Sequence, residues 1–235
     1  MPRINIQQIL IRILVLTLSL STHEYAHARM AYHLGDDTAE RQGRLTLNPT
    51  KHLDPLGALA FVIAGFGWAR PVPVNPARFN RTKVKTMRRG MMYVALAGPV
   101  SNLIIAFIAN LIYQIIRFIL IALKVTANTG FAGMIDILFL ILATFYASNI
   151  SLALFNMLPI PPLDGSRVLG GFLSDRAYHK YMSIQQYSML ILFALIIFGG
   201  GIVGRIIGYA AIPIDYILRV PVESLFKALS KAVIG

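Results

Sequence analysis

Hydrophobic residues along this chain gather into four long runs, separated by shorter polar stretches. The runs cover residues 5–34, 91–123, 134–158 and 183–204. A helix of about 20 apolar residues crosses the hydrocarbon core of a bilayer, so each run is long enough to span a membrane. The pattern therefore predicts an all-α polytopic membrane protein with about four spanning helices.

Two further stretches have patterns of their own. Residues 55–69 are apolar but too short to span a bilayer, and they contain three glycines, which disfavour a helix. We expect a re-entrant loop or hairpin there, with a short interfacial helix as the alternative. Residues 214–235 alternate apolar positions with Lys and Arg and are interrupted by Pro221. They predict an interfacial C-terminal segment.

The composition agrees with a membrane protein. Of 235 residues, 56% are hydrophobic and 14% charged, whereas soluble domains carry about 25% charged residues. These values exclude a disordered chain, a coiled coil and a small disulfide-stapled module. The chain has no cysteine, so a metal ion would be held by His, Asp or Glu.

The charge distribution predicts the orientation. The formal net charge is +12, and eleven of the 22 Lys and Arg residues lie between residues 29 and 89. If residues 55–69 return to their own side of the membrane, the positive-inside rule makes this whole region cytoplasmic and places the N-terminus outside. No basic stretch is interleaved with aromatic residues, so we expect a lipid bilayer as the anionic partner and no nucleic acid.

The N-terminus has an alternative interpretation as a cleavable signal peptide. Arg3 and Arg12 precede an apolar run and the small-residue triplet Ala26-His27-Ala28. Cleavage there would leave a chain that is still strongly hydrophobic, and it would cut through His23–His27. We therefore favour a retained span.

The second half of the first run contains the motif His23-Glu24-Tyr25-Ala26-His27. Residues i and i+4 share one face of a helix, so the two imidazoles can converge on one metal ion. Glu24 lies beside that face, where it can polarise a metal-bound water. Ionisable groups in an apolar helix cost several kcal/mol unless they are paired or metal-bound. A polar cluster without metal is the alternative.

A catalytic metal site of this kind needs a third protein ligand. His33 follows His23 by ten residues, which is about 15 Å along a continuous helix, so it is a poor candidate. Asp136 lies towards the external end of the third run. Asp54 is more typical of a helix cap or a surface acid.

Asp164 is the better candidate for the third ligand. It lies in the segment 156–165, directly after the third run, where three prolines prevent a regular helix. Irregular backbone at membrane depth is tolerated only where it is buried in protein or lines a wet cavity. An acid in such a segment is a natural metal ligand.

These motifs together resemble the site-2 proteases, a family of intramembrane zinc metalloproteases. The resemblance rests on His23–His27, on residues 156–165, and on two intermediate signatures at residues 67–76 and 97–102. All four occur in the family's order and extend over about residues 15–175. The resemblance implies a single membrane protease domain over residues 1–235, in the compact form that lacks the PDZ-like and nucleotide-sensing domains of some relatives.

The resemblance also implies the chemistry. One Zn²⁺ per chain would be held by His23, His27 and Asp164, with Glu24 as general base and acid in peptide hydrolysis. Asn156 would donate to the developing oxyanion or orient the metal ligands, and the alternative is that it bonds to backbone groups that Pro159 or Pro161 leaves free. The substrate would be a transmembrane protein or peptide, and the enzyme a multi-pass protein of a bacterial or archaeal plasma membrane, with its active site towards the cytoplasm.

Several points stay open at this level. Within the domain, the metal-site core would cover about residues 5–175, and the fourth span with the C-terminal segment would cover 183–235. Asn102 is either a helix-packing polar group or a catalytic one. Residues 55–69 would offer a strand edge to an unwound substrate, and the glycines at 199–201 could gate its entry. The alternative function is a membrane metal-binding or transport protein without proteolytic turnover.

Overall fold

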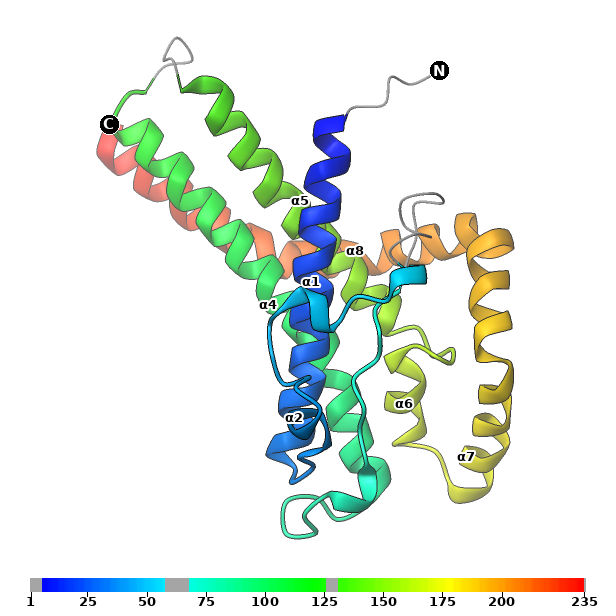
Figure 1. Ribbon diagram of the computed structural model, residues 1–235. Helices are drawn as coiled ribbons and strands as arrows, with labels where there is room; N and C mark the ends of the chain where they lie inside the picture. Colours follow the sequence, from blue (N-terminus) through cyan, green and yellow to red (C-terminus); the bar gives the residue numbers. More distant parts are fainter. Residues whose placement is uncertain (1–5, 58–67, 126–130, 235) are drawn as a thin grey trace.

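The computed structural model describes residues 6–57, 68–125 and 131–234, which form a bundle of helices around the first and second spans (Figure 1). The α-helices are α1 (Ile6–His33), α2 (Thr38–Arg41), α4 (Met87–Ala122), α5 (Ala132–Asn156), α6 (Asp164–Gly170), α7 (Asp175–Met182) and α8 (Ser188–Ile234). Short 3₁₀ turns η1 (Pro49–Lys51), η2 (Pro76–Arg78) and η3 (Ser183–Tyr187) lie in the connections.

Four stretches of helix in the described part of the chain are long and apolar enough to cross a membrane. They are α1, α4, α5 and the portion Ile197–Val233 of α8. The prediction of an all-α polytopic membrane protein is confirmed. The first three predicted runs correspond to α1, α4 and α5.

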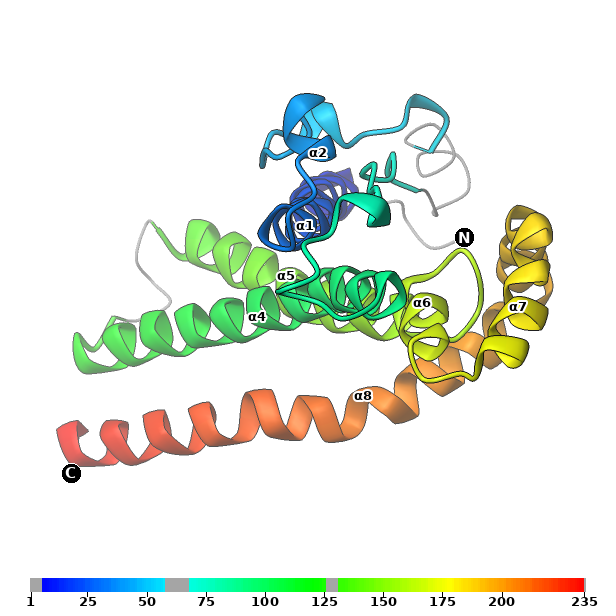
Figure 2. The same ribbon diagram turned by 90° about the horizontal axis from the view of Figure 1, so that it is seen from below.

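The C-terminal part of the chain differs from its prediction. We expected a span ending at residue 204 and a separate segment broken at Pro221, but α8 continues through both Pro213 and Pro221 to Ile234. Membrane helices tolerate proline where neighbouring helices support the backbone, and α8 contacts α4 and α5 (Figure 2). The predicted break at Pro221 is therefore wrong. The interfacial location of residues 214–235 stays a prediction.

Small residues bring α1 and α4 close together. Ala28 and Ala31 of α1 and Ala95 and Ala106 of α4 are all almost completely buried. Side chains of this size let two helix backbones approach, and dispersion contacts then stabilise the pair. α4 also contacts α5, α6 and α8, so it is the helix around which the others are arranged (Figure 1).

Most of the predicted re-entrant stretch, residues 58–67, lies outside the described residues. The chain on either side of it is described, and the two ends lie together. Leu53 and Ala69 form an isolated antiparallel bridge, and the Arg70 N–H donates to the His52 carbonyl at 2.7 Å. The described residues on the two sides of this stretch are therefore held together by backbone pairing.

Candidate metal centre

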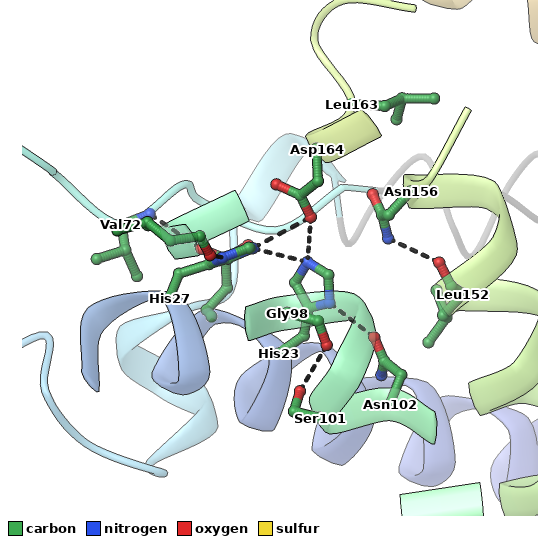
Figure 3. Close-up of polar contacts among 12 residues, drawn as sticks. His23, His27, Val72, Gly98, Ser101, Asn102, Leu152, Asn156, Leu163 and Asp164 are labelled. Atoms are coloured by element: carbon green, nitrogen blue, oxygen red, sulfur yellow. Dashed lines mark hydrogen bonds and ion pairs between the residues drawn. The ribbon is translucent and has the colours of Figure 1, made fainter. Parts of the chain in front are cut away.

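Three side chains from two distant parts of the sequence converge in the bundle (Figure 3). α1 supplies His23 and His27, whose Nε2 atoms are 3.0 Å apart. Asp164, the first residue of α6, places Oδ2 at 3.1 Å from Nε2 of His23 and 3.2 Å from Nε2 of His27. Both imidazoles are buried and the carboxylate is nearly so. These three atoms are close enough together to hold one metal ion.

The other nitrogen of each imidazole faces a hydrogen-bond acceptor. Nδ1 of His23 lies 2.7 Å from Oδ1 of Asn102, and Nδ1 of His27 lies 2.7 Å from the Val94 carbonyl. Each Nδ1 must therefore carry the proton, which leaves each Nε2 with a free lone pair. This is the tautomer in which both Nε2 atoms can bind a metal ion.

A chain of buried amides fixes the orientation of Asn102. Nδ2 of Asn149 donates to the Phe145 carbonyl at 2.8 Å and to Oγ of Ser19 at 2.8 Å. A carbonyl can only accept, so Oδ1 of Asn149 faces Asn102, whose Nδ2 donates to it at 2.8 Å. Oδ1 of Asn102 is then turned towards His23. The backbone of α5 thereby determines which nitrogen of His23 is protonated.

Gly98 makes room for both imidazoles. A Cβ atom at this position would lie 2.5 Å from Cε1 of His23 and 2.5 Å from Nε2 of His27. Such distances are far below van der Waals contact, so no side chain fits there. The absence of a side chain at residue 98 lets α4 approach the histidine face of α1.

The turn between α5 and α6 brings Asp164 to the histidines. Gly165 approaches the backbone of Met157 so closely that a Cβ would collide with the Met157 carbonyl. The Tyr181 hydroxyl donates to the Pro159 carbonyl at 2.8 Å and holds the turn from the other side. An acid in the first turn of a helix is also stabilised by the helix dipole.

The donor set fits a metal cation. Oδ2 of Asp164 is buried and receives no hydrogen bond from the described residues. A buried acceptor without a donor is costly, and here it faces two imidazole lone pairs at about 3 Å. A cation among the three atoms would satisfy all of them. Two His and one carboxylate are ligands that catalytic zinc sites use.

Glu24 lies beside the three ligand atoms and outside their group. Its Oε2 accepts a hydrogen bond from the Val72 N–H at 2.9 Å. The side chain lines a cavity of about 410 Å³ together with His23, His27 and Asp164. The carboxylate is therefore placed next to the candidate metal position and in a space that a peptide could enter.

Asn156 lines the same cavity. Its Nδ2 donates to the Leu152 carbonyl of its own helix at 3.0 Å. This is not a bond to backbone freed by the following prolines, because Leu152 lies one turn back in α5; the oxyanion role stays a prediction. The contact orients the amide and leaves its second N–H hydrogen available.

The acids and histidine rejected as ligands are indeed elsewhere. His33 is exposed at the end of α1, and its carbonyl accepts from Nζ of Lys83. Asp136 is exposed near the start of α5. Asp54 accepts from the N–H groups of Leu56 and Gly57 at 2.9 Å, so its expected role as a cap is confirmed.

Sequence reasoning missed several residues that shape this site. Asn149 and Ser19 were not singled out, and Gly98 was noted only as part of a signature. Asn102 was weighed between helix packing and catalysis, whereas it contacts a candidate ligand directly. One signal was available: an amide in an apolar helix needs a partner, and Asn102 and Asn149 lie in consecutive spans.

A helical membrane protein with two histidines and an aspartate converging beside a glutamate belongs to the class of membrane-embedded metalloproteases. The sequence comparisons agree, since Peptidase family M50 matches residues 11–199. The chain belongs to this family. It is a zinc metalloprotease and an integral membrane protein, and its expected cofactor is Zn²⁺.

The chain is similar to relatives that carry the same description. It is 40% identical over 185 residues to "Putative zinc metalloprotease YwhC" of Bacillus subtilis (strain 168), which covers 79% of both chains. It is 31% identical over 185 residues to "Putative zinc metalloprotease Rip2" of Mycolicibacterium smegmatis (strain ATCC 700084 / mc(2)155), covering 77% of this chain and 64% of the relative. No solved structure matches the chain significantly.

Proposed function

We propose that this protein is an intramembrane protease that hydrolyses peptide bonds in or near the transmembrane segments of other membrane proteins. His23, His27 and Asp164 would hold the zinc ion. The observation that carries this proposal is the convergence of their three ligand atoms, 3.0 to 3.2 Å apart, inside a bundle of membrane-spanning helices. When bound, zinc supplies Lewis acidity that activates water and polarises a carbonyl.

Glu24 would act as the general base and then as the general acid. Its carboxylate takes a proton from water and returns it to the leaving amine. The Val72 N–H holds Oε2, which leaves Oε1 for the proton transfer. Since the Nδ1 protons of both histidines are engaged by Asn102 and Val94, Glu24 is the proton acceptor best placed in the cavity.

Asn156 would donate to the oxyanion that develops on the substrate. Its amide lines the cavity, and the bond to Leu152 uses only one of its two N–H hydrogens. The second hydrogen can point into the cavity without loss of the first bond. A preorganised donor of this kind stabilises developing negative charge because it need not reorient.

The substrate would be a membrane protein cleaved from the cytoplasmic side. The cavity walls come from membrane helices and from the extended chain at Trp68–Val74, so an extended peptide fits better than a folded domain. Basic residues gather in the connection between α1 and α4, and Arg167, Arg176 and Lys180 lie in the short helices α6 and α7 (Figure 1). By the positive-inside rule these basic segments face the cytoplasm and the N-terminus lies outside.

The test compares the wild type with Glu24→Gln, each co-expressed with tagged single-span membrane proteins. We expect Glu24→Gln to abolish cleavage and to retain zinc, because the ligands are untouched. Metal analysis of the purified proteins provides the second measurement. A metal carrier would lose function only with its ligands, so cleavage that is equal in the two proteins contradicts the proposal.

A further inference from the structure

Arg44 is a buried cation that the chemistry above does not use. Its side chain is 6% exposed, and it forms no ion pair with an acid in the described part of the chain. Nη2 donates to the Arg70 carbonyl at 2.6 Å and to the Pro71 carbonyl at 3.3 Å. A buried guanidinium without a carboxylate is costly, so its position calls for an electrostatic reason.

The peptide group between Pro71 and Val72 links this cation to Glu24. The Pro71 carbonyl accepts from Arg44, and the N–H on the other side of the same peptide bond donates to Oε2 of Glu24. One peptide group is therefore held between a positive and a negative side chain. The peptide dipole points in the direction that favours both contacts.

Such an arrangement strengthens each hydrogen bond. A guanidinium that draws electron density towards the carbonyl makes the N–H a better donor to the carboxylate, and both bonds are charge-assisted. Burial and the neighbouring Arg70 lower the pKa of Arg44, whereas the attraction of Glu24 opposes them. Glu24 is thus the acid whose negative charge attracts Arg44.

We propose that Arg44 is a positioning residue for Glu24. Through the Pro71–Val72 peptide it keeps Oε2 of Glu24 occupied and the carboxylate turned into the cavity. This inference rests on the proposed function, because it requires Glu24 to be the general base. It predicts an effect on proton transfer that is separate from metal binding and from substrate binding.

The experiment measures kcat, KM and zinc content for Arg44→Gln and Arg44→Lys in detergent, with a cleaved single-span substrate. Positioned proton transfer contributes about 10²- to 10⁴-fold to a rate. We expect Arg44→Gln to lower kcat on the order of 10-fold, with KM and zinc content unchanged. Arg44→Lys keeps the charge and a donor, so it should recover most of kcat.

Asp36→Asn is the matched control. Oδ2 of Asp36 accepts from the Asn75 N–H at 2.6 Å, so it anchors the same extended segment beyond the Pro71–Val72 peptide. If Asp36→Asn lowers kcat as much as Arg44→Gln, then Arg44 only anchors the segment and the inference is wrong. It is also wrong if Arg44→Lys is no better than Arg44→Gln, or if Arg44→Gln loses zinc.

The two proposals fail in different ways. If Glu24→Gln cleaves like the wild type, there is no base to position and both proposals fail. If Glu24→Gln is inactive while Arg44→Gln keeps full kcat, only the role of Arg44 is overturned. Should Arg44→Gln not fold, Arg44→Met takes its place, because it also removes the charge and the donors but keeps a long side chain. A lower kcat with unchanged KM and zinc content supports positioning, and an unchanged kcat or a higher KM alone contradicts it.

Discussion

Two clusters of polar side chains lie among the apolar helices, and they are built differently. The first is the metal centre with the amides behind it. The second, here called the α8 cluster, consists of Tyr146 on α5 and Asp215, Arg219 and Glu223 on α8. Polar groups inside a membrane are expensive, so both clusters need an explanation.

The α8 cluster satisfies its own charges. Asp215 accepts from the Tyr146 hydroxyl at 2.8 Å and from Nη2 of Arg219 at 2.8 Å. Nη1 of Arg219 also lies 3.4 Å from Glu223. Both acids therefore have a donor, and the cluster's contacts join α8 to α5. These contacts are sufficient to account for the α8 cluster as a structural feature.

The metal centre leaves three converging acceptor atoms without a hydrogen-bond donor. Each Nδ1 has an acceptor, and the amides behind His23 are paired. Among the described residues, Oδ2 of Asp164 receives no hydrogen bond, and it faces the Nε2 lone pairs of His23 and His27, which also have no donor. A deficit of donors at one buried point thus distinguishes a cation site from a structural cluster.

The sharpest test of this comparison exchanges one carboxylate for an amide in each cluster. Asp164→Asn keeps the shape but removes the charged ligand, so we expect zinc affinity to fall by about 100-fold or more, with loss of cleavage. Asp215→Asn is the matched control and should bind zinc like the wild type. Competition with a chelator of known affinity measures both. Equal affinity in the two variants would contradict the distinction.

A methyl group added beside the imidazoles should have the next largest effect. Gly98→Ala places Cβ 2.5 Å from both rings, so α4 or the rings must move, and we expect cleavage to fall by at least about 10-fold. Gly208→Ala in α8 has open space around its Cβ. This control should retain activity and gain up to about 1 kcal/mol in helix propensity. Initial rates of cleavage and thermal unfolding report the two effects.

Removal of the acceptor behind His23 should have a smaller effect. Asn102→Leu leaves Nδ1 of His23 without an acceptor, so either ring nitrogen of His23 can carry the proton. Hydrogen-bond partners of metal ligands contribute about 10- to 100-fold to metal affinity. Asn110→Leu on the same helix removes an amide that donates to the Leu218 carbonyl at 3.2 Å, near the α8 cluster. Zinc titration should separate the two variants. A similar loss in both would mean that the buried amides act only through packing.

The smallest effect is expected for a single hydroxyl in the α8 cluster. Tyr146→Phe removes the hydrogen bond to Asp215, while Arg219 still neutralises the acid. We expect a loss of about 0.5–1.5 kcal/mol in stability, with zinc content and kcat unchanged. Thermal unfolding in detergent, followed by metal analysis, measures both quantities. A change in kcat would show that the α8 cluster does communicate with the metal centre.

The parts of the site that were predictable are those fixed by local spacing. His23 and His27 lie one helical turn apart, so any helix brings them together, and the proline-rich turn made Asp164 a reasonable third ligand. The first three spans followed from length and hydropathy alone. These features need no knowledge of which helix packs against which.

The parts that were not predictable depend on contacts between helices. Asn102 meets His23 only because α4 lies against α1 in one particular register, and Asn149 joins them only through α5. Arg44 reaches the Pro71 carbonyl across a folded connection. The break expected at Pro221 was wrong for the same reason, since support from neighbouring helices overrides the local effect of proline.

One face of α4 has a consequence for how this protein can evolve. Val94, Gly98 and Asn102 are spaced four residues apart and contact His27, both imidazoles and His23 respectively, although α4 supplies no ligand. Position 94 contributes a backbone carbonyl, so it can accept any residue of similar size. Position 98 is closed to every side chain, and position 102 is restricted to residues with an acceptor. Descendants that keep the three ligands should therefore drift at 94, stay invariant at 98 and vary narrowly at 102.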